Sequence, residues 1–198
     1  MIDHYRALFQ RYGWLEDRLR WIVVRPLDEE LTVDDLLWRL NGGRDPEHRV
    51  VRHPREAPSL EDRPLFFLFE DAGAWGLFEF GHGFVLPDDA LAELSEGARL
   101  WMTSWHFNGG WTLLYAADGR IRAWTRDFVF TEFRSEDGDP SVLAGFRGML
   151  DGLGPEDFQG RRAAALAFIE ESAGLRLEGD WLDADEATAI ILDGPSVA

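Results

Sequence analysis

The sequence predicts an α+β fold in which helices from both ends of the chain pack on a mostly antiparallel sheet of about five to seven strands. Three observations lead to this prediction. Strand-like segments gather between residues 64 and 124, tight-turn signals join several of them, and helical periodicity dominates after residue 139. Strands grouped in the middle of a chain are typical of α+β domains, because parallel folds alternate strand with helix.

Composition limits the class of protein. The chain has 198 residues, 45% hydrophobic and 13% aromatic, so it can build one core, and we expect a single domain over 1–198. The lack of cysteine excludes disulfides, thiolate metal sites and thiol nucleophiles, and indicates a reducing compartment. No apolar run reaches about 18 residues and Met1–His4 does not resemble a signal peptide, so we expect a cytoplasmic protein without membrane contact.

The N-terminal third predicts two helices and a strand. Apolar residues spaced i, i+3, i+4 and i+7 give the first helix one buried face, and they are Tyr5, Leu8, Phe9 and Tyr12. Gly13 ends that helix, and residues 19–24 predict a strand. Thr32 and Asp35 then form a capping-box pattern before a leucine-rich helix that ends at residues 41–43.

Residues 44–63 predict a flexible surface loop, because three prolines and a mixture of charges interrupt any periodicity. The loop holds the one concentration of basic side chains in the sequence, namely Arg49, Arg52, His53 and Arg55. These side chains suit a bound phosphate or carboxylate. The alternative is a mobile insertion that is neutralised by its own acidic residues.

A hairpin and a short helix are predicted next. Residues 65–69 form a continuous apolar run, as in a strand covered on both faces, and turn residues at 71–73 join it to a second strand over 75–80. Residues 88–96 predict a short helix that begins with two acids and is ended by Gly97.

The following three strands form a predicted meander. In residues 99–107 one face carries Arg99, Trp101, Thr103, Trp105 and Phe107, and the other carries Leu100, Met102, Ser104 and His106. Turn signals at 108–110 and at Asp118-Gly119 lead into strands over 111–116 and 121–124.

The C-terminal part predicts helices. Asp139 and Pro140 suit the N-cap and first position of a helix that continues to Leu150. Residues 161–173 predict an alanine-rich helix, and a last short helix is expected from Asp183.

Several short motifs occur in an informative order. They are Trp105-His106-Phe107-Asn108, Tyr115-Ala116-Ala117-Asp118-Gly119-Arg120, Asp139-Pro140 with Leu143, Ala163-Ala164-Ala165-Leu166-Ala167, Gly174-Leu175-Arg176-Leu177 and Trp181-Leu182. This order resembles the mainly actinobacterial family catalogued as domain of unknown function 6461, over roughly residues 90–185 with an echo at 32–42. The family is uncharacterised, so the resemblance implies a single bacterial cytoplasmic domain but no activity, cofactor or catalytic residue.

The charge is large and unevenly spread. The net charge is −17, and residues 64–198 hold nine arginines against 24 acids, whereas residues 1–63 are nearly neutral. A negative field repels nucleic acid and anionic membranes and attracts basic partners. We therefore expect no direct nucleic-acid binding and a basic protein partner. The alternative is that the acidic surface serves solubility alone.

Motifs that usually carry chemistry are missing from the sequence, including the P-loop, G-x-S-x-G and H-E-x-x-H patterns. The five histidines have no metal-ligand spacing, so we predict no metal, no cofactor and no catalytic residue. His106 and His82 precede or lie within glycine turns, and Ser104 could be drawn beside His106 as a nucleophile. Ordinary hydrogen-bonded histidines are the alternative.

Tryptophan and its polar neighbours supply the predicted binding residues, which are Trp101, Trp105, His106, Asn108, Trp111, Asp118 and Trp124. These tryptophans either fill the core or form an aromatic and acidic patch for a basic protein or cationic ligand. The patch is the hypothesis that gives the protein a binding face.

Three functions follow from these observations. The favoured one is a non-catalytic protein-binding module, such as an inhibitor, an immunity-like factor or an accessory subunit, that uses the acidic, tryptophan-rich C-terminal face. The second is a small-molecule-binding protein or enzyme with a pocket near residues 44–63. The third is a nucleic-acid mimic that presents carboxylates in place of phosphates.

Overall fold

The computed structural model describes residues 1–27, 29–51, 63–79, 86–132 and 134–193. Its helices are α1 (Ile2–Arg11), the 3-10 helix η1 (Gly13–Glu16), α2 (Val33–Leu40), α3 (Asp88–Leu94), α4 (Ala144–Asp151), α5 (Phe158–Ala173) and α6 (Gly179–Leu182). Its strands are β1 (Arg18–Pro26), β2 (Glu47–Val51), β3 (Leu65–Asp71), β4 (Ala74–Glu79), β5 (Ala98–His106), β6 (Thr112–Ala117), β7 (Arg120–Arg126), β8 (Ser135–Gly138) and β9 (Ala187–Ile191).

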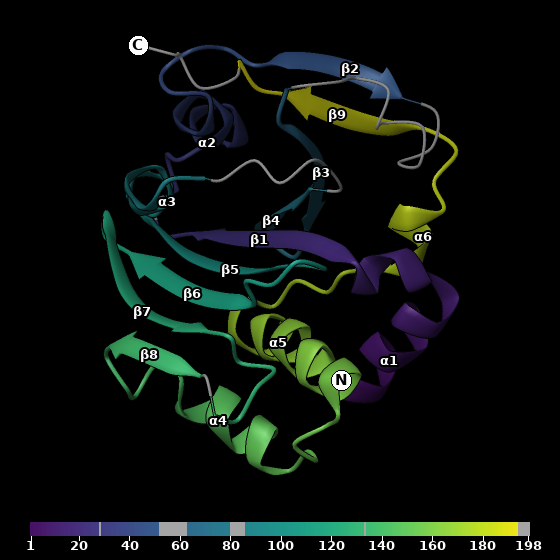
Figure 1. The fold of residues 1–198 in the computed structure, drawn as a ribbon. Coiled ribbons are helices and arrows are strands. Elements are labelled where there is room, and N and C mark those ends of the chain that lie inside the picture. The colour runs from purple at the N-terminus through teal and green to yellow at the C-terminus, as the bar shows by residue number, and fades with distance from the viewer. Residues whose placement is uncertain (28, 52–62, 80–85, 133, 194–198) are drawn as a thin grey trace.

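All nine described strands belong to one antiparallel sheet in the order β2-β9-β3-β4-β1-β5-β6-β7-β8 (Figure 1). The predicted α+β class and antiparallel sheet are confirmed, but the sheet is larger than the five to seven strands expected. Strand β9, from the C-terminal end, lies between β2 and β3, so segments far apart in the sequence pair side by side.

Helices cover the two faces of the sheet unequally. Helices α1, α4 and α5 pack on one face, where the larger apolar cluster lies, and the short helices α2 and α3 pack on the other (Figure 1). Strand β5 separates the two clusters by alternation, because Trp101 and Trp105 point toward the α5 side, whereas Leu100 and Met102 point toward the α3 side. The facing predicted for this strand is therefore confirmed.

The positions predicted from the sequence for α1, α2 and α3 are confirmed. Helices α1 and α3 lie where the periodicity placed them. Helix α2 begins with a complete capping box, in which the Asp35 amide donates to the Thr32 hydroxyl (3.2 Å) and the Thr32 amide donates to the Asp35 carboxylate (3.0 Å).

Three expectations need correction, and one strand was missed. The helix expected from Asp183 is wrong, since this residue ends α6 and the following residues form β9. Residues 47–51 of the predicted surface loop form β2, whereas 52–62 lie outside the described residues. Strand β8 was not predicted. Helix α4 begins at Ala144 rather than at Pro140, because residues 141–143 form turns.

Helix α5 packs closely because of its alanines. Ala163, Ala164, Ala165 and Ala167 are fully buried between the sheet and α1. Small side chains let a helix approach its neighbours closely, and the bulky rings of the sheet fill the space that remains. Asp157 caps this helix by accepting a hydrogen bond from the Gly160 amide (2.9 Å), so α5 begins earlier than residue 161.

Among the described residues, every helix is too short or too polar to span a membrane.

Candidate functional site

One end of the sheet face under α3 is polar. In the antiparallel register, Arg20 pairs with Glu79 on one side and with Ser104 on the other, Ser104 pairs with Thr112, and Thr112 pairs with Arg126. These five residues form a row across β4, β1, β5, β6 and β7, which we call the polar row. Paired residues on one face have their side chains about 5 Å apart, so neighbours in the row meet.

A hollow of about 180 Å³ opens over this row. Its polar lining comes from the row and from the start of α3, namely Arg20, Ser104, Thr112, Arg126 and Asp88. Its apolar lining comes from α3, from the segment that precedes it and from the next row of the sheet, namely Leu86, Leu91, Met102, Leu114 and Trp124. We call this hollow the Arg20 pocket.

Arg20 is a buried cation at the floor of the pocket. Its side chain is only 14% exposed and forms an ion pair through Nη1 with Glu79, which is 6% exposed. Burial lowers the pKa of Arg20, and the nearby Glu79 carboxylate partly offsets that effect. The Nε atom of Arg20 is itself buried and forms no hydrogen bond with another described residue, which lowers stability somewhat.

The other polar groups of the pocket are equally available. Arg126 lies over the Trp124 ring, with 4.6 Å from its guanidinium carbon to the ring centroid, and it forms no ion pair with any described residue. Within the described part of the chain, the hydroxyl groups of Ser104 and Thr112 accept and donate no hydrogen bond. The pocket therefore offers two guanidinium groups and two hydroxyl groups to a ligand.

Two of the predicted binding tryptophans lie in the core instead. Trp105 is buried against α1, and its indole nitrogen donates to the Leu15 carbonyl oxygen (2.8 Å). Trp101 is buried between Tyr115 and the Phe168 ring of α5. Because both side chains are covered by helices, they cannot contact a partner at the surface, and for them the core alternative is the correct one.

Three more of the predicted binding residues lie in different parts of the structure. Trp111 packs edge-on against Phe130, and Asp118 pairs with Arg122 (3.0 Å) at the hairpin between β6 and β7. Trp124 lines the Arg20 pocket. The structure therefore brings together only part of the predicted set.

The predicted residues His106 and Asn108 lie at the end of β5. His106 pairs with Arg18, one row beyond Ser104 on the pocket face, and its Nδ1 accepts a hydrogen bond from the Asn108 amide (3.3 Å). The Ser104 and His106 side chains therefore share a face, as the alternation predicted. His82 lies outside the described residues.

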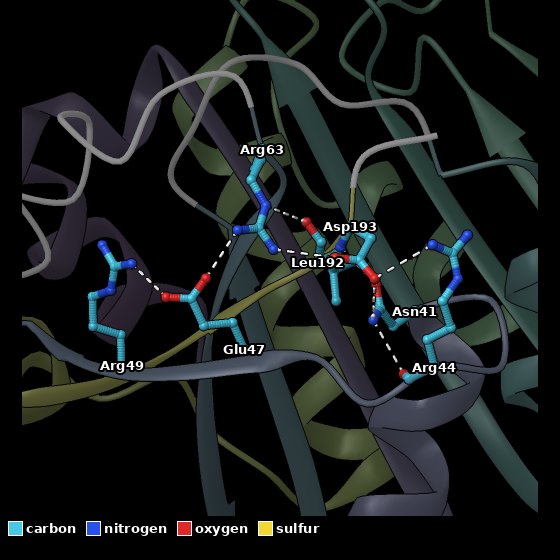
Figure 2. A network of polar contacts seen from close by, with 7 residues as sticks. All are labelled: Asn41, Arg44, Glu47, Arg49, Arg63, Leu192 and Asp193. Carbon is cyan, nitrogen blue, oxygen red and sulfur yellow. Dashed lines mark hydrogen bonds and ion pairs between the residues drawn. The ribbon is translucent and has the colours of Figure 1, made fainter. Parts of the chain in front are cut away.

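Of the predicted anion-binding loop, only Arg49 is described, since Arg52, His53 and Arg55 fall within 52–62. Arg49 pairs with Glu47, which also accepts a hydrogen bond from Arg63 (2.9 Å), as Figure 2 shows. These two arginines hold the pKa of the Glu47 carboxyl below its usual range. An external anion would thus compete with Glu47 for Arg49.

The same network joins the ends of β2, β3 and β9. Arg63 donates to the Leu192 carbonyl oxygen (3.1 Å) and to Asp193 (3.3 Å), and the Asp193 amide donates to the Asn41 side chain (2.7 Å). Figure 2 shows Arg44 approaching Asp193 from the far side. These contacts connect elements to one another, so we interpret the network as structural.

Sequence reasoning missed Arg20, Thr112 and Arg126 as site residues. Each lies in or beside a segment that the sequence predicts as a strand, but the polar row depends on the register of five strands. One signal was present, since Ser104 and His106 interrupt the apolar face of β5. Among the described residues, no group of three or more histidine or acidic side chains could hold a metal ion.

Comparison with protein-family models, with curated proteins and with solved structures found no match in any of the three. The resemblance to domain of unknown function 6461 therefore stays a prediction from the motifs.

Proposed function

We propose that this protein binds a small ligand in the Arg20 pocket. The observation that carries the proposal is a hollow lined by the guanidinium groups of Arg20 and Arg126 and by the hydroxyl groups of Ser104 and Thr112, which form no hydrogen bond with another described residue. Concave sites with apolar walls and a few convergent polar groups are typical ligand sites.

The size of the pocket limits the ligand. The hollow of about 180 Å³ is smaller than the roughly 300–1,000 Å³ typical of sites for drug-sized molecules. A small metabolite is therefore the expected occupant. Guanidinium groups stay protonated at all accessible pH values, so they bind and orient a ligand rather than exchange protons with it. This chemistry favours binding over catalysis.

The proposal belongs to the second function predicted from the sequence but places the pocket elsewhere. Strand β2, which comes from this region of the sequence, lies at one edge of the sheet, and three strands separate β2 from β1. The Arg20 pocket lies over β1, β5, β6 and β7.

A thermal-shift screen of neutral, cationic and anionic metabolites tests the proposal. A ligand at about 100 times its Kd stabilises the folded state by about 2.7 kcal/mol, which raises the Tm of a chain of this size by roughly 5–10 °C. Ser104→Tyr should fill the pocket and abolish the shift. Thr188→Tyr places the same ring at an exposed position of β9 and should preserve it. A hit that survives Ser104→Tyr would place the ligand elsewhere.

A protein partner is the second candidate function. Two exposed aromatic side chains favour it, Trp38 on α2 (47% exposed) and Phe107 in the turn after β5 (61% exposed), on a chain of net charge −17. A pull-down across a salt series, repeated with Trp38→Ala and Phe107→Ala, tests it. Retention of a basic protein that both substitutions leave unchanged would argue against these anchors. The nucleic-acid mimic also stays a prediction, which a nuclease-inhibition assay would test.

A further inference from the structure

We infer that the ligand of the Arg20 pocket is a small carboxylate with an apolar body. This inference rests on the proposed ligand-binding function and adds the chemical class of the ligand. Three features of the pocket support it: the division of its lining into two halves, the charge of its polar half and its size.

The lining is divided along the strands. The polar row supplies one end of the floor, and the next row inward is apolar. That next row contains Met102, Leu114 and Trp124, each two residues away from Ser104, Thr112 or Arg126 on the same face of its strand. Helix α3 adds Leu91 to the apolar half. A ligand that satisfies both halves must carry a polar group at one end and an apolar group at the other.

The polar half contains two arginines. Arg126 forms no ion pair with a described residue, whereas Arg20 is paired with Glu79. Arginine binds carboxylates through charge-assisted hydrogen bonds that are stronger than neutral ones. Arg20 and Arg126 stand three strand spacings apart in the row, about 14 Å, and Ser104 and Thr112 lie between them.

The one arginine without an ion pair favours a singly charged ligand over a doubly charged one. Glu79 pairs with Arg20, so among the described residues Arg126 is the arginine of the polar row that is left for an anion, while Asp88 adds a negative charge to the lining. A carboxylate matches one arginine, whereas phosphate at neutral pH brings up to two negative charges and offers nothing to the apolar half. Asp88 lines the rim of the pocket. A ligand with an ammonium group beside its carboxylate, as in an amino acid, would also reach this acid.

Isothermal titration calorimetry with four probes tests the inference. The probes are 4-methylpentanoate, its neutral amide 4-methylpentanamide, leucine and inorganic phosphate. We expect the carboxylate to bind at least about tenfold more tightly than the amide and than phosphate, because only the carboxylate satisfies both halves of the pocket. Leucine tests Asp88, since Asp88→Asn should weaken leucine and leave 4-methylpentanoate unchanged.

Arg126→Gln is the decisive variant, because Arg126 is exposed and its loss should leave the fold intact. We expect it to weaken 4-methylpentanoate about tenfold or more. Arg120→Gln is the matched control, at the other end of the same strand and without an ion pair among the described residues, and it should bind as the unaltered protein does. Equal losses in both variants would indicate a general charge effect and overturn the inference.

The outcomes separate the inference from the proposed function. If the amide or phosphate binds as tightly as the carboxylate, the carboxylate class is wrong and the ligand-binding function stands. The same holds if no probe binds while a neutral metabolite does, and Ser104→Tyr abolishes its binding. If no metabolite binds at a site sensitive to Ser104→Tyr, both fail.

Discussion

Two buried arginines show how single residues of this protein hold charge away from water. Arg20 uses the Glu79 carboxylate, whereas Arg161 is paired mainly with neutral acceptors, since it donates to the carbonyl oxygens of Gly154 and Phe128 (3.3 Å each) and to Thr131 (3.4 Å). Burial lowers the pKa of both side chains, and in Arg161 the positive charge of Arg134 adds to that effect. The first arginine lines a pocket, and the second ties α5 to the loop after β7.

Glu79→Gln should strongly destabilise the protein. The substitution leaves the Arg20 guanidinium buried without its counter-charge, and breaking such a pair costs about 3–5 kcal/mol in comparable cases. Urea unfolding measures the change. Glu70→Gln, at an exposed position of the neighbouring strand β3, serves as control and should change the free energy of unfolding little. The double variant Arg20→Met with Glu79→Leu should recover much of the lost free energy of unfolding, because apolar side chains need no counter-charge. A double variant as unstable as Glu79→Gln would contradict this explanation.

The Asp157 carboxyl makes the stability of the protein depend on pH. A hydrogen bond from Arg6 is the main cause that lowers the pKa of Asp157 below its ordinary value, and the amide of Gly160 adds to it. A carboxyl whose pKa is lower in the folded state stabilises the protein above its unfolded pKa, and this contribution is lost as pH falls toward the lowered value. The pair is partly exposed, with side chains about 30% accessible, so the effect is moderate.

We therefore expect Asp157→Ala to reduce stability by about 1 kcal/mol at pH 7, mainly through the lost helix cap. The difference from the unaltered protein should shrink as pH falls below about 4. Unfolding curves from pH 7 to pH 3 measure this. Asp185→Ala removes an exposed acid for comparison. A difference that stays constant over the whole pH range would show that the charge of Asp157 contributes nothing.

The residues of the candidate site could be predicted only in part. The alternation of β5 placed Ser104 and His106 on one face, and the tryptophan count drew attention to Trp124. Arg20 and Arg126 gave no signal, since a single charged residue in a strand is typical of a solvent-exposed position. Their place in one row across the sheet arises from strand pairing, which is not encoded in any local pattern.

At the scale of elements, close packing between β1, β4 and the segment after α5 depends on one glycine. A Cβ atom at Gly76 would overlap the indole ring of Trp21 and lie 2.9 Å from a methyl carbon of Leu175. Both neighbours are completely buried, so neither has room to move. The backbone of β4 can therefore approach this ring only because residue 76 has no side chain.

Gly76→Ala should destabilise the protein by about 1–3 kcal/mol through overpacking. Gly148→Ala is the matched control, because residue 148 lies in α4 with open space around its Cβ position. In a helix this change should stabilise by roughly 0.5–1 kcal/mol. Thermal or urea unfolding of both variants provides the comparison. A neutral Gly76→Ala would mean that Trp21 and Leu175 can repack.

Elements differed in how far the sequence predicted them. Helix α2 carries its own capping box, and the hairpin between β6 and β7 carries an Asp-Gly turn, so both are specified locally. Strand β2 is polar and exposed, and it exists because β9, more than 130 residues away in the chain, pairs with it. Strand β8 likewise depends on the exposed edge of β7. Such edge strands are set by partners rather than by their own residues.

At the scale of the whole molecule, repulsion among acids opposes the compact fold. The net charge is −17, and the described arginines are largely used in pairs with nearby acids or in bonds to carbonyl oxygens. Such surface pairs contribute little individually. The excess acids therefore form a negative field that the fold must tolerate, and salt screens that field over about 10 Å at 0.1 M.

Stability should accordingly rise with salt at pH 8, in contrast to a protein held together by surface ion pairs. The urea midpoint at constant temperature should increase between 20 mM and 500 mM sodium chloride, because screening weakens repulsion in the compact state more than in the expanded chain. The same experiment near pH 5, close to the sequence pI of about 4.6, is the control, since the net charge there is small and the salt effect should nearly vanish. Equal salt effects at both pH values would point to ion-specific binding, which replacing chloride with sulfate would reveal. A midpoint that falls with salt at pH 8 would show instead that attractive pairs outweigh the repulsion among the excess acids.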